Sequence, residues 1–187
     1  MKKKQKNHFQ DYKDFLKPPK EGDIIKGMVV SKEKEGIFLD LLNYKTGVVK
    51  KEDLKFGGKT ISKIKEGEEI DVKIMGQEDD QGLVPVSLKE ATQDIVWQDL
   101  QNNQEKNEVL DLKVVSVNKG GLMFNVFGIP GFMPVSQLSK DNYPKLENPT
   151  PEKVFQELKK FVGEEMKVKV ITADKFRKKL ILKEASV

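Results

Sequence analysis

The feature of the sequence that most constrains its fold is an internal repeat. Two stretches align without a gap at an offset of 85 residues, and the match continues after a deletion of one residue. Each copy ends on the same tetrapeptide, LKEA, at residues 88–91 and 182–185. A tandem duplication of this kind folds as two copies of one small module. The matched pairs are Val30 with Val115, Ser31 with Ser116, Lys34 with Lys119, Gly36 with Gly121, Asp40 with Asn125, Gly47 with Gly131, Val48 with Phe132, Val49 with Met133 and Leu54 with Leu138.

Within each copy the residue pattern is typical of β-structure. Five short runs of β-branched and apolar residues are separated by Gly, Asn, Asp and Lys, which indicates short strands joined by turns. We therefore predict an all-β fold of two tandem five-stranded barrels of the oligonucleotide/oligosaccharide-binding (OB) type, because closing a small sheet removes its exposed edges. A small β-sandwich is the structural alternative. The runs lie at residues 23–33, 36–43, 46–54, 69–77 and 82–88, and again at 109–118, 121–127, 131–138, 165–174 and 179–185.

The stretch between the two copies has no strand pattern. Residues 89–104 contain neither Gly nor Pro, and we predict a linker helix there. Trp97, the only tryptophan, either packs this helix against a barrel, which is the more common arrangement, or stacks on a nucleic-acid base. The predicted segments are an N-terminal arm (1–20), a first barrel (21–91), a helical linker (92–106) and a second barrel (107–187).

A further helix is predicted between the third and fourth strands of the second copy. Thr150 is a suitable N-cap, and Pro151 suits the first helical position. The apolar side chains that follow share one face, which we expect to close one end of the barrel. They are Val154, Phe155, Leu158, Phe161 and Val162.

The N-terminal arm carries an apolar stripe at helical spacing and ends at Pro18 and Pro19. Because so short a helix is marginal in water by itself, the arm either docks in the groove of a partner or is a packed or mobile tail. The candidate docking residues are Phe9, Tyr12, Phe15 and Leu16.

The net charge alternates along the chain. It is +5 in the arm, −3 over residues 21–91, −2 over residues 92–106 and +4 over residues 107–187. Since several cations must face the phosphates for RNA to bind, the arm and the second copy are better candidates than the first copy. The single arginine, Arg177, leaves almost no bidentate recognition of bases. We expect RNA contacts that depend on lysine and have little sequence specificity.

Several functional classes are disfavoured by residues that the sequence lacks. It has no Cys and a single His, His8, so disulfides, zinc sites and histidine-dependent triads are not expected. It has no phosphate-loop motif, and the acidic run at residues 78–80 is typical of a turn. No apolar run reaches the ~18 residues of a membrane span, and no signal peptide is visible. We expect a cytoplasmic protein that is not an enzyme and has no metal, cofactor, small-molecule substrate or membrane contact.

The order of these motifs resembles the S1 RNA-binding domain family. The segments EGDIIKGMVV, GIFLDL, TGVVKKEDL and VPVSLKEA resemble one such domain, and VNKGGLMFNVFGIPGFMP resembles a second. Together with SLKEATQDIVWQDL between them, they are similar to the first two domains of the bacterial ribosomal protein S1 family, over roughly residues 20–186. The resemblance implies a ribosome-associated translation protein that helps the small subunit to capture messenger RNA.

The same resemblance implies the partners. In that family the first two domains mainly anchor the protein to the small ribosomal subunit, with ribosomal protein S2 as the expected neighbour. Messenger RNA or ribosomal RNA is the expected nucleic acid. The alternatives are an accessory S1 module of a ribonuclease or of a polynucleotide phosphorylase, a stand-alone RNA-binding regulator, and a module that binds only protein.

The RNA-binding pattern of the family is only partly present. RNA-binding copies carry an aromatic residue before the glycine of the second strand, where this chain has Glu35 and Gly120. They carry a second aromatic residue two positions after that glycine, where the first copy keeps Phe38 and the second has Met123. They also carry a histidine on the third strand, where this chain has Lys50 and Pro134. Because stacking is worth ~1–3 kcal/mol per base, these losses predict weak binding. The lysines at positions 34, 50, 119, 169, 178 and 183 are either an RNA face or ordinary solvated surface. The candidate RNA contacts are Lys34, Phe38, Lys50, Lys119, Met123, Asp174 and Lys178.

The most apolar stretch, KGGLMFNVFGIPGFMPVS at residues 119–136, carries three phenylalanines. Strand alternation predicts that Phe124 is in the core and that Met123 is on the outer face. Phe132, which aligns with Val48, is also predicted to be interior. Phe127 lies beside a turn and is assigned to neither face. The richest aromatic stretch thus argues against strong stacking on RNA.

Overall fold

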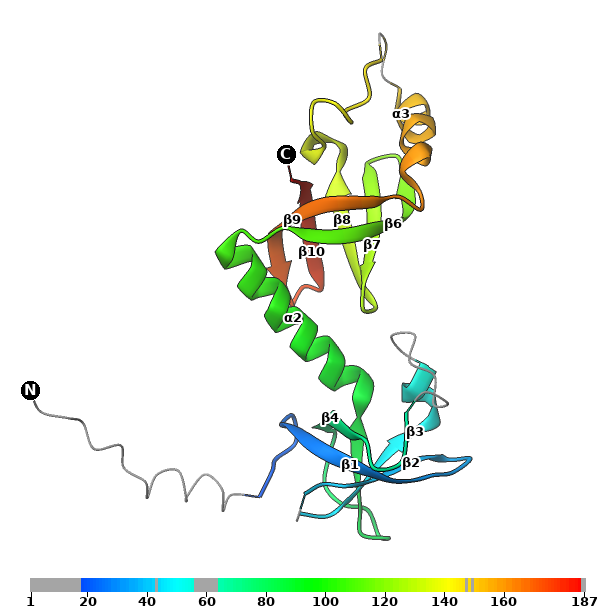
Figure 1. Cartoon of the computed structure of the whole chain (residues 1–187), viewed down its shortest axis with the longest axis vertical. Helices are drawn as coiled ribbons and strands as arrows, with labels where there is room; N and C mark the ends of the chain where they lie inside the picture. Colours follow the sequence, from blue (N-terminus) through cyan, green and yellow to red (C-terminus); the bar gives the residue numbers. More distant parts are fainter. Residues whose placement is uncertain (1–17, 43, 56–63, 147, 149, 186–187) are drawn as a thin grey trace, which may run out of the picture. The chain divides into compact units, whose positions relative to one another are not determined.

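Both copies of the repeat fold into closed five-stranded β-barrels in the computed structural model, which confirms the predicted all-β fold (Figure 1). The chain divides into two compact units, Met1–Ala91 and Thr92–Val187, and each unit holds one barrel. The structure describes residues 18–42, 44–55, 64–146, 148 and 150–185. The predicted arm helix, with Phe9, Tyr12, Phe15 and Leu16, lies outside the described residues.

Barrel 1 closes in the strand order β1-β2-β3-β5-β4. Neighbouring strands are antiparallel except β3 and β5, which run parallel. A short 3-10 helix, η1 (Lys51–Lys55), follows β3. The strands are β1 (Ile24–Lys32), β2 (Gly36–Asp40), β3 (Thr46–Lys50), β4 (Glu69–Ile74) and β5 (Leu83–Ser87).

Barrel 2 repeats this topology, with β8 and β10 as its parallel pair. The first strand of each barrel carries a bulge at the same point of the repeat, between Val29 and Ser31 in β1 and between Val114 and Ser116 in β6. The duplication has therefore kept the local bend that lets a small sheet close. The strands are β6 (Leu110–Asn118), β7 (Gly121–Val126), β8 (Ile129–Pro134), β9 (Glu165–Asp174) and β10 (Lys179–Glu184).

Each barrel is filled by alternate side chains of its strands. Ile37, Leu39 and Val49 are fully buried in barrel 1, and Leu122 and Phe124 are buried in barrel 2. The burial of Phe124, which is 2% exposed, confirms the alternation predicted along β7. Met123, on the opposite face of the same strand, is only half-buried.

The prediction that Phe132 is interior is wrong. Along β8 the buried positions are Ile129, Gly131 and Met133, so Phe132 between them points out of the barrel and is half-buried. Val48, its counterpart in β3, is also an outward, half-buried position. The alignment was correct, but apolar character was mistaken for burial, whereas the period of two along the strand decides the face.

The linker helix, α2 (Leu88–Lys106), begins directly after β5 and packs on barrel 2. The Ser87 hydroxyl accepts a hydrogen bond from the backbone N–H of Glu90 at 2.9 Å, which caps the first turn. Trp97 is 6% exposed and belongs with Leu100 to the core cluster of barrel 2. Of the two interpretations of Trp97, packing is the correct one.

The helix predicted from Thr150 is α3 (Pro151–Leu158), followed by the 3-10 turn η4 (Lys159–Phe161). The Thr150 side chain accepts a hydrogen bond from the N–H of Lys153, as an N-cap does. Leu158 is fully buried, and Val154 and Phe161 pack on the same core, whereas Val162 is 45% exposed. Within the described residues, no helix combines the length and apolar character needed to cross a membrane.

Candidate nucleic-acid interface

Three apolar side chains form a row on the outer surface of barrel 2. In the sheet register Met123 of β7 lies opposite Phe132 of β8, and Phe132 lies opposite Ile181 of β10. All three side chains are half-buried, although they point away from the core. This outer row gives barrel 2 an apolar strip that contains one aromatic ring, Phe132, on which a base can stack.

The ring of Phe132 lies against a pair of glycines. A Cβ placed on Gly120 would be 3.5 Å from the Phe132 Cζ atom, and one on Gly121 would be 3.0 Å from its Cε2 atom. The absence of side chains at both positions leaves room for the ring. The Phe132 ring from β8 therefore lies over Gly120, the position at which the sequence resemblance led us to look for an aromatic residue.

Two lysines flank the outer row. Lys183 of β10 lies directly opposite Lys169 of β9, and both are half-buried. Within the described residues neither lysine has an ion pair or a hydrogen bond through its side chain. Like charges in directly opposite positions destabilise a sheet, and a phosphate between them would relieve the repulsion. We call Lys169 and Lys183 the lysine pair.

The β9–β10 turn holds two of the predicted RNA contacts. The carboxylate of Asp174 accepts a hydrogen bond from the backbone N–H of Arg177 at 2.9 Å. The backbone N–H of Lys178 donates to the carbonyl of Lys175 at 3.2 Å, and the Lys178 side chain is exposed. Asp174 therefore shapes the turn, and Lys178 presents its charge to solvent.

Lys119, another predicted contact, already has an acidic partner. Its Nζ atom donates a hydrogen bond to Glu152 at the start of α3 at 2.6 Å, and both side chains are exposed. The hydrogen bond from Lys119 and that from the helix backbone hold the pKa of Glu152 below its usual value. Glu152 offsets much of the charge that Lys119 would offer to a phosphate.

Barrel 1 has a similar outer row but different charges. Phe38 of β2 lies opposite Val48 of β3, which lies opposite Pro85 of β5, and all three are half-buried. The predicted contacts Lys34 and Lys50 are exposed near one end of this row. The β4–β5 turn carries Glu78, Asp79 and Asp80, where barrel 2 carries lysines and an arginine. The Asp79 carboxylate accepts hydrogen bonds from the N–H groups of Gln81 and Leu83 and so shapes this turn, as predicted.

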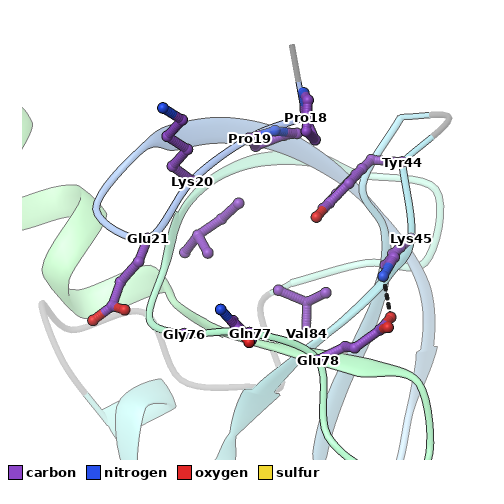
Figure 2. A pocket seen from close by; sticks show the side chains of 11 residues that line it. Pro18, Pro19, Lys20, Glu21, Tyr44, Lys45, Gly76, Gln77, Glu78 and Val84 are labelled. Atoms are coloured by element: carbon purple, nitrogen blue, oxygen red, sulfur yellow. Dashed lines mark hydrogen bonds and ion pairs between the residues drawn. The ribbon is translucent and has the colours of Figure 1, made fainter.

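A hollow of about 400 Å³ lies in barrel 1, where Ile74, Gly76 and Val84 contribute to its lining. Figure 2 shows that Pro18 and Pro19 form one side of it, with Tyr44 beside them. The ammonium of Lys45 is paired with the Glu78 carboxylate at its edge, and this hydrogen bond raises the pKa of Lys45. Because these two charges offset each other, this hollow is a weaker candidate for phosphate than the surface of barrel 2.

The described part of the chain contains no group of three or more His, Cys, Asp or Glu residues that could hold a metal ion. Its ionic contacts are instead scattered pairs on the surface. One example is Lys26, whose hydrogen bond to Glu69 at 2.8 Å raises the pKa of the ammonium. The arrangement that stands out chemically is therefore the apolar outer row of barrel 2 with its unpaired lysines.

The burial of Trp97 gives a direct test of which surface meets RNA. Because Trp97 is in the core of barrel 2, adding single-stranded RNA is expected to leave its fluorescence emission nearly unchanged. Unfolding in urea is expected to shift the emission to the red, as the indole enters water. Strong quenching by RNA without unfolding would show that the base-stacking interpretation of Trp97 was the correct one.

Sequence reasoning named Lys169 and Lys183 among the possible contacts, but it missed Phe132, Ile181 and the pairing of the two lysines, which depend on register. Phe132, Ile181 and the lysine pair come together only because β8, β10 and β9 are neighbours in the closed sheet. The outward position of Phe132 could have been predicted from the alternation along β8, because its neighbour Gly131 faces inward. Met123 was correctly placed on the outer face from the same kind of alternation in β7.

Comparison with known proteins agrees with this geometry. A family model described as "S1 RNA binding domain" matches residues 18–89 and 103–183, which are the two barrels. The chain is similar to the small ribosomal subunit protein bS1 of Mycolicibacterium smegmatis, with 28% identity over 165 residues, covering 87% of this chain and 32% of that protein. The bS1 protein of Streptococcus pneumoniae is 33% identical over 167 residues, covering 87% of this chain and 39% of that protein.

A relative of another class also matches. The 4-hydroxy-3-methylbut-2-enyl diphosphate reductase of Fusobacterium nucleatum is 28% identical over 127 residues, which are 66% of this chain and 14% of that protein. The chain spans about a third of the M. smegmatis protein and less than half of the S. pneumoniae protein.

Proposed function

Because the chain belongs to the S1 RNA-binding domain family, we propose that it binds single-stranded RNA on the outer face of barrel 2, weakly and with little preference for sequence. The observation that carries this proposal is the outer row of Met123, Phe132 and Ile181 beside the lysine pair. Every base has a π-face that can stack on an aromatic ring such as that of Phe132, and lysines attract the phosphates whatever the sequence.

The charge distribution supports barrel 2 as the main RNA-binding unit. Residues 107–187 carry a net charge of +4, and residues 21–91 carry −3. On β10, Lys179 lies two residues before Ile181 and Lys183 lies two residues after it, so cations stand on both sides of the outer row along this strand. The single arginine of the chain makes base-specific hydrogen bonding a minor contribution.

We propose further that the chain works in translation, with the small ribosomal subunit, messenger RNA or ribosomal RNA as its partners. The names of the two ribosomal relatives support this role and a cytoplasmic location, and they favour a protein that is not an enzyme. Barrel 1 and the arm mainly anchor the chain, with ribosomal protein S2 as a neighbour, while Lys34, Phe38 and Lys50 add weaker RNA contacts. The reductase relative supports a second candidate, an accessory module of an enzyme.

A salt titration tests the RNA-binding proposal. Fluorescence anisotropy with a short, unstructured oligouridine should show binding at low salt that weakens steeply as salt is added. With four lysines near phosphates, the slope of log affinity against log salt is expected to be about −3. Absence of binding even at low salt would remove the RNA proposal and leave a module that binds only protein.

Co-sedimentation with small ribosomal subunits tests the anchoring role. The chain should sediment with subunits that contain ribosomal protein S2 and less with subunits depleted of it. Deletion of residues 1–19 should weaken the association. Association that survives the deletion undiminished would contradict the docking role of Phe9, Tyr12, Phe15 and Leu16, and no association at all would favour the accessory module.

A further inference from the structure

The turn between β7 and β8 places a large aromatic residue where one is rarely found. Phe127 and Gly128 form a two-residue hairpin loop, because Val126 pairs with Ile129. Both have positive φ, 49° and 83°, as a type I′ turn requires. Asn or Asp normally precedes Gly in such turns, and a bulky residue with positive φ is an outlier. The side chain of Phe127 is 61% exposed.

Packing among the described residues of barrel 2 does not explain why Phe127 occupies this position. The turn is already supported by Asn125, whose side-chain oxygen accepts a hydrogen bond from the N–H of Gly128 at 2.6 Å. Phe127 does not belong to the core cluster of the barrel. A strained conformation that keeps an aromatic ring in water is a reason to look for a ligand.

The turn between β9 and β10 exposes a second ring. Phe176 is 98% exposed. The turn that carries it is held in place by a 2.8 Å ion pair between Lys175 and Asp94 of α2. At the end of β9, Ala173 donates its N–H to Gln104 of α2 at 3.0 Å and accepts a hydrogen bond from Gln101 of the same helix at 3.3 Å. Because α2 supports the turn, the backbone that carries the Phe176 ring is held in place.

These two turns lie at the same end of barrel 2. β8 and β10 are parallel neighbours, with Leu180 opposite Gly131, so both strands begin at one edge of the sheet. The Phe127 turn leads into β8 and the Phe176 turn leads into β10, and Figure 1 shows both at the lower end of this barrel. Four cations belong to the second turn and the start of β10: Lys175, Arg177, Lys178 and Lys179.

We propose that Phe127 and Phe176 form an aromatic end of barrel 2 that stacks on unpaired bases of a single RNA strand, while Lys178 and Lys179 contact its phosphates. This inference rests on the proposed function, because the aromatic end continues the outer row along β8 and β10. Rings among cations suit a strand whose bases stack and whose backbone is anionic.

Barrel 1 serves as an internal comparison. Its β4–β5 turn has Glu78, Asp79 and Asp80 in place of the cations. Its β2–β3 turn has Leu42, which is also left-handed at φ 45° and is 43% exposed, in place of an aromatic ring. The one aromatic ring that the described residues of these two turns hold in barrel 1, Tyr44, is partly buried against the barrel core, and the cation beside it, Lys45, is paired with Glu78. Within the described part of the chain, exposed rings among unpaired lysines are therefore found in the turns of barrel 2, and the aromatic end is assigned to that barrel.

The substitution Phe127→Asn separates binding from folding. Asn before Gly suits a type I′ turn better than Phe does, so the melting temperature is expected to stay unchanged or to rise. Affinity for a short oligouridine is expected to fall about tenfold, the size of one stacking contact, with the same salt slope. Phe176→Ser is expected to weaken binding similarly, again without a change in salt slope.

The matched control is Leu42→Asn, which makes the same kind of change in barrel 1 and should leave RNA affinity unaltered. An abasic strand of the same length should bind the wild type and both Phe variants equally, because it offers no base to stack. Wild-type affinity for oligouridine in both Phe variants would overturn the aromatic end and leave the proposed function standing.

Two other outcomes are also decisive. If the wild type itself does not bind oligouridine, the proposed function fails together with this inference. If the Phe variants lose binding to anionic phosphatidylserine vesicles but keep their affinity for RNA, the aromatic end meets a lipid surface and the RNA assignment is wrong. Loss of oligouridine binding without loss of vesicle binding is the result expected.

Discussion

Alanine in place of Gly121 is expected to destabilise barrel 2 by about 3 kcal/mol or more, which is the upper range for forcing atoms into a packed site. A Cβ at this position would lie 2.0 Å from the carbonyl oxygen of Met133, which is backbone and cannot move aside without distorting β8. Urea unfolding followed by Trp97 fluorescence measures the effect, because Trp97 is in the core of the same barrel.

The neighbouring glycine supplies the control. A Cβ on Gly120 would meet its nearest atoms at 3.4 and 3.5 Å, which is ordinary contact, so Gly120→Ala should cost less than about 1 kcal/mol. The repeat adds a second case, since a Cβ on Gly36 would lie 2.2 Å from the carbonyl oxygen of Val49 in barrel 1. Equal stability of the Gly120 and Gly121 variants would contradict the packing described for β7 and β8.

Lys183→Glu is expected to weaken RNA binding about 30-fold, because reversing one charge changes its interaction with a phosphate ~4 Å away by about 2 kcal/mol in water. The same substitution should slightly stabilise the fold. Glu at this position would lie opposite Lys169 and replace a repulsive pair by an attractive one, worth ~0.2–1 kcal/mol. Anisotropy titration and thermal unfolding of the same sample measure both effects.

The control for this prediction is Lys51→Glu, which changes the net charge equally at an exposed position of η1 in barrel 1. It should reduce RNA affinity much less than Lys183→Glu does. The slope of log affinity against log salt should fall by about 0.7 for Lys183→Glu, as expected for one lost phosphate contact on a single strand. Equal losses in the two variants would mean that net charge, and not the lysine pair, governs binding.

Local patterns in the sequence were sufficient to predict most of the fold. The repeat and the period of two predicted five strands in each barrel, and the N-cap at Thr150 predicted α3. Phe124 was correctly predicted to be in the core, because the alternation of side chains along one strand decides which face of the sheet each residue occupies. The turn at residues 78–80 was predicted from local chemistry, since Asp and Gly favour turns by themselves.

The parts of the site that the sequence did not predict depend on contacts between distant residues. Lys169 faces Lys183 only in the register of two strands, and Lys119 is offset by Glu152, which is 33 residues away. The exposure of Phe127 depends on the left-handed conformation of one turn. Phe132 could have been placed on the outer face from alternation, had burial not been inferred from its apolar character.

The central claim is that the outer face of barrel 2 is where RNA binds. Amide chemical shifts of the isotope-labelled chain, followed while a short oligouridine is added at low salt, test it residue by residue. The largest shifts are expected at Phe132, Ile181 and Lys183, with smaller shifts around Phe38 of barrel 1. Shifts concentrated in barrel 1, with those three amides of barrel 2 unmoved, would contradict it.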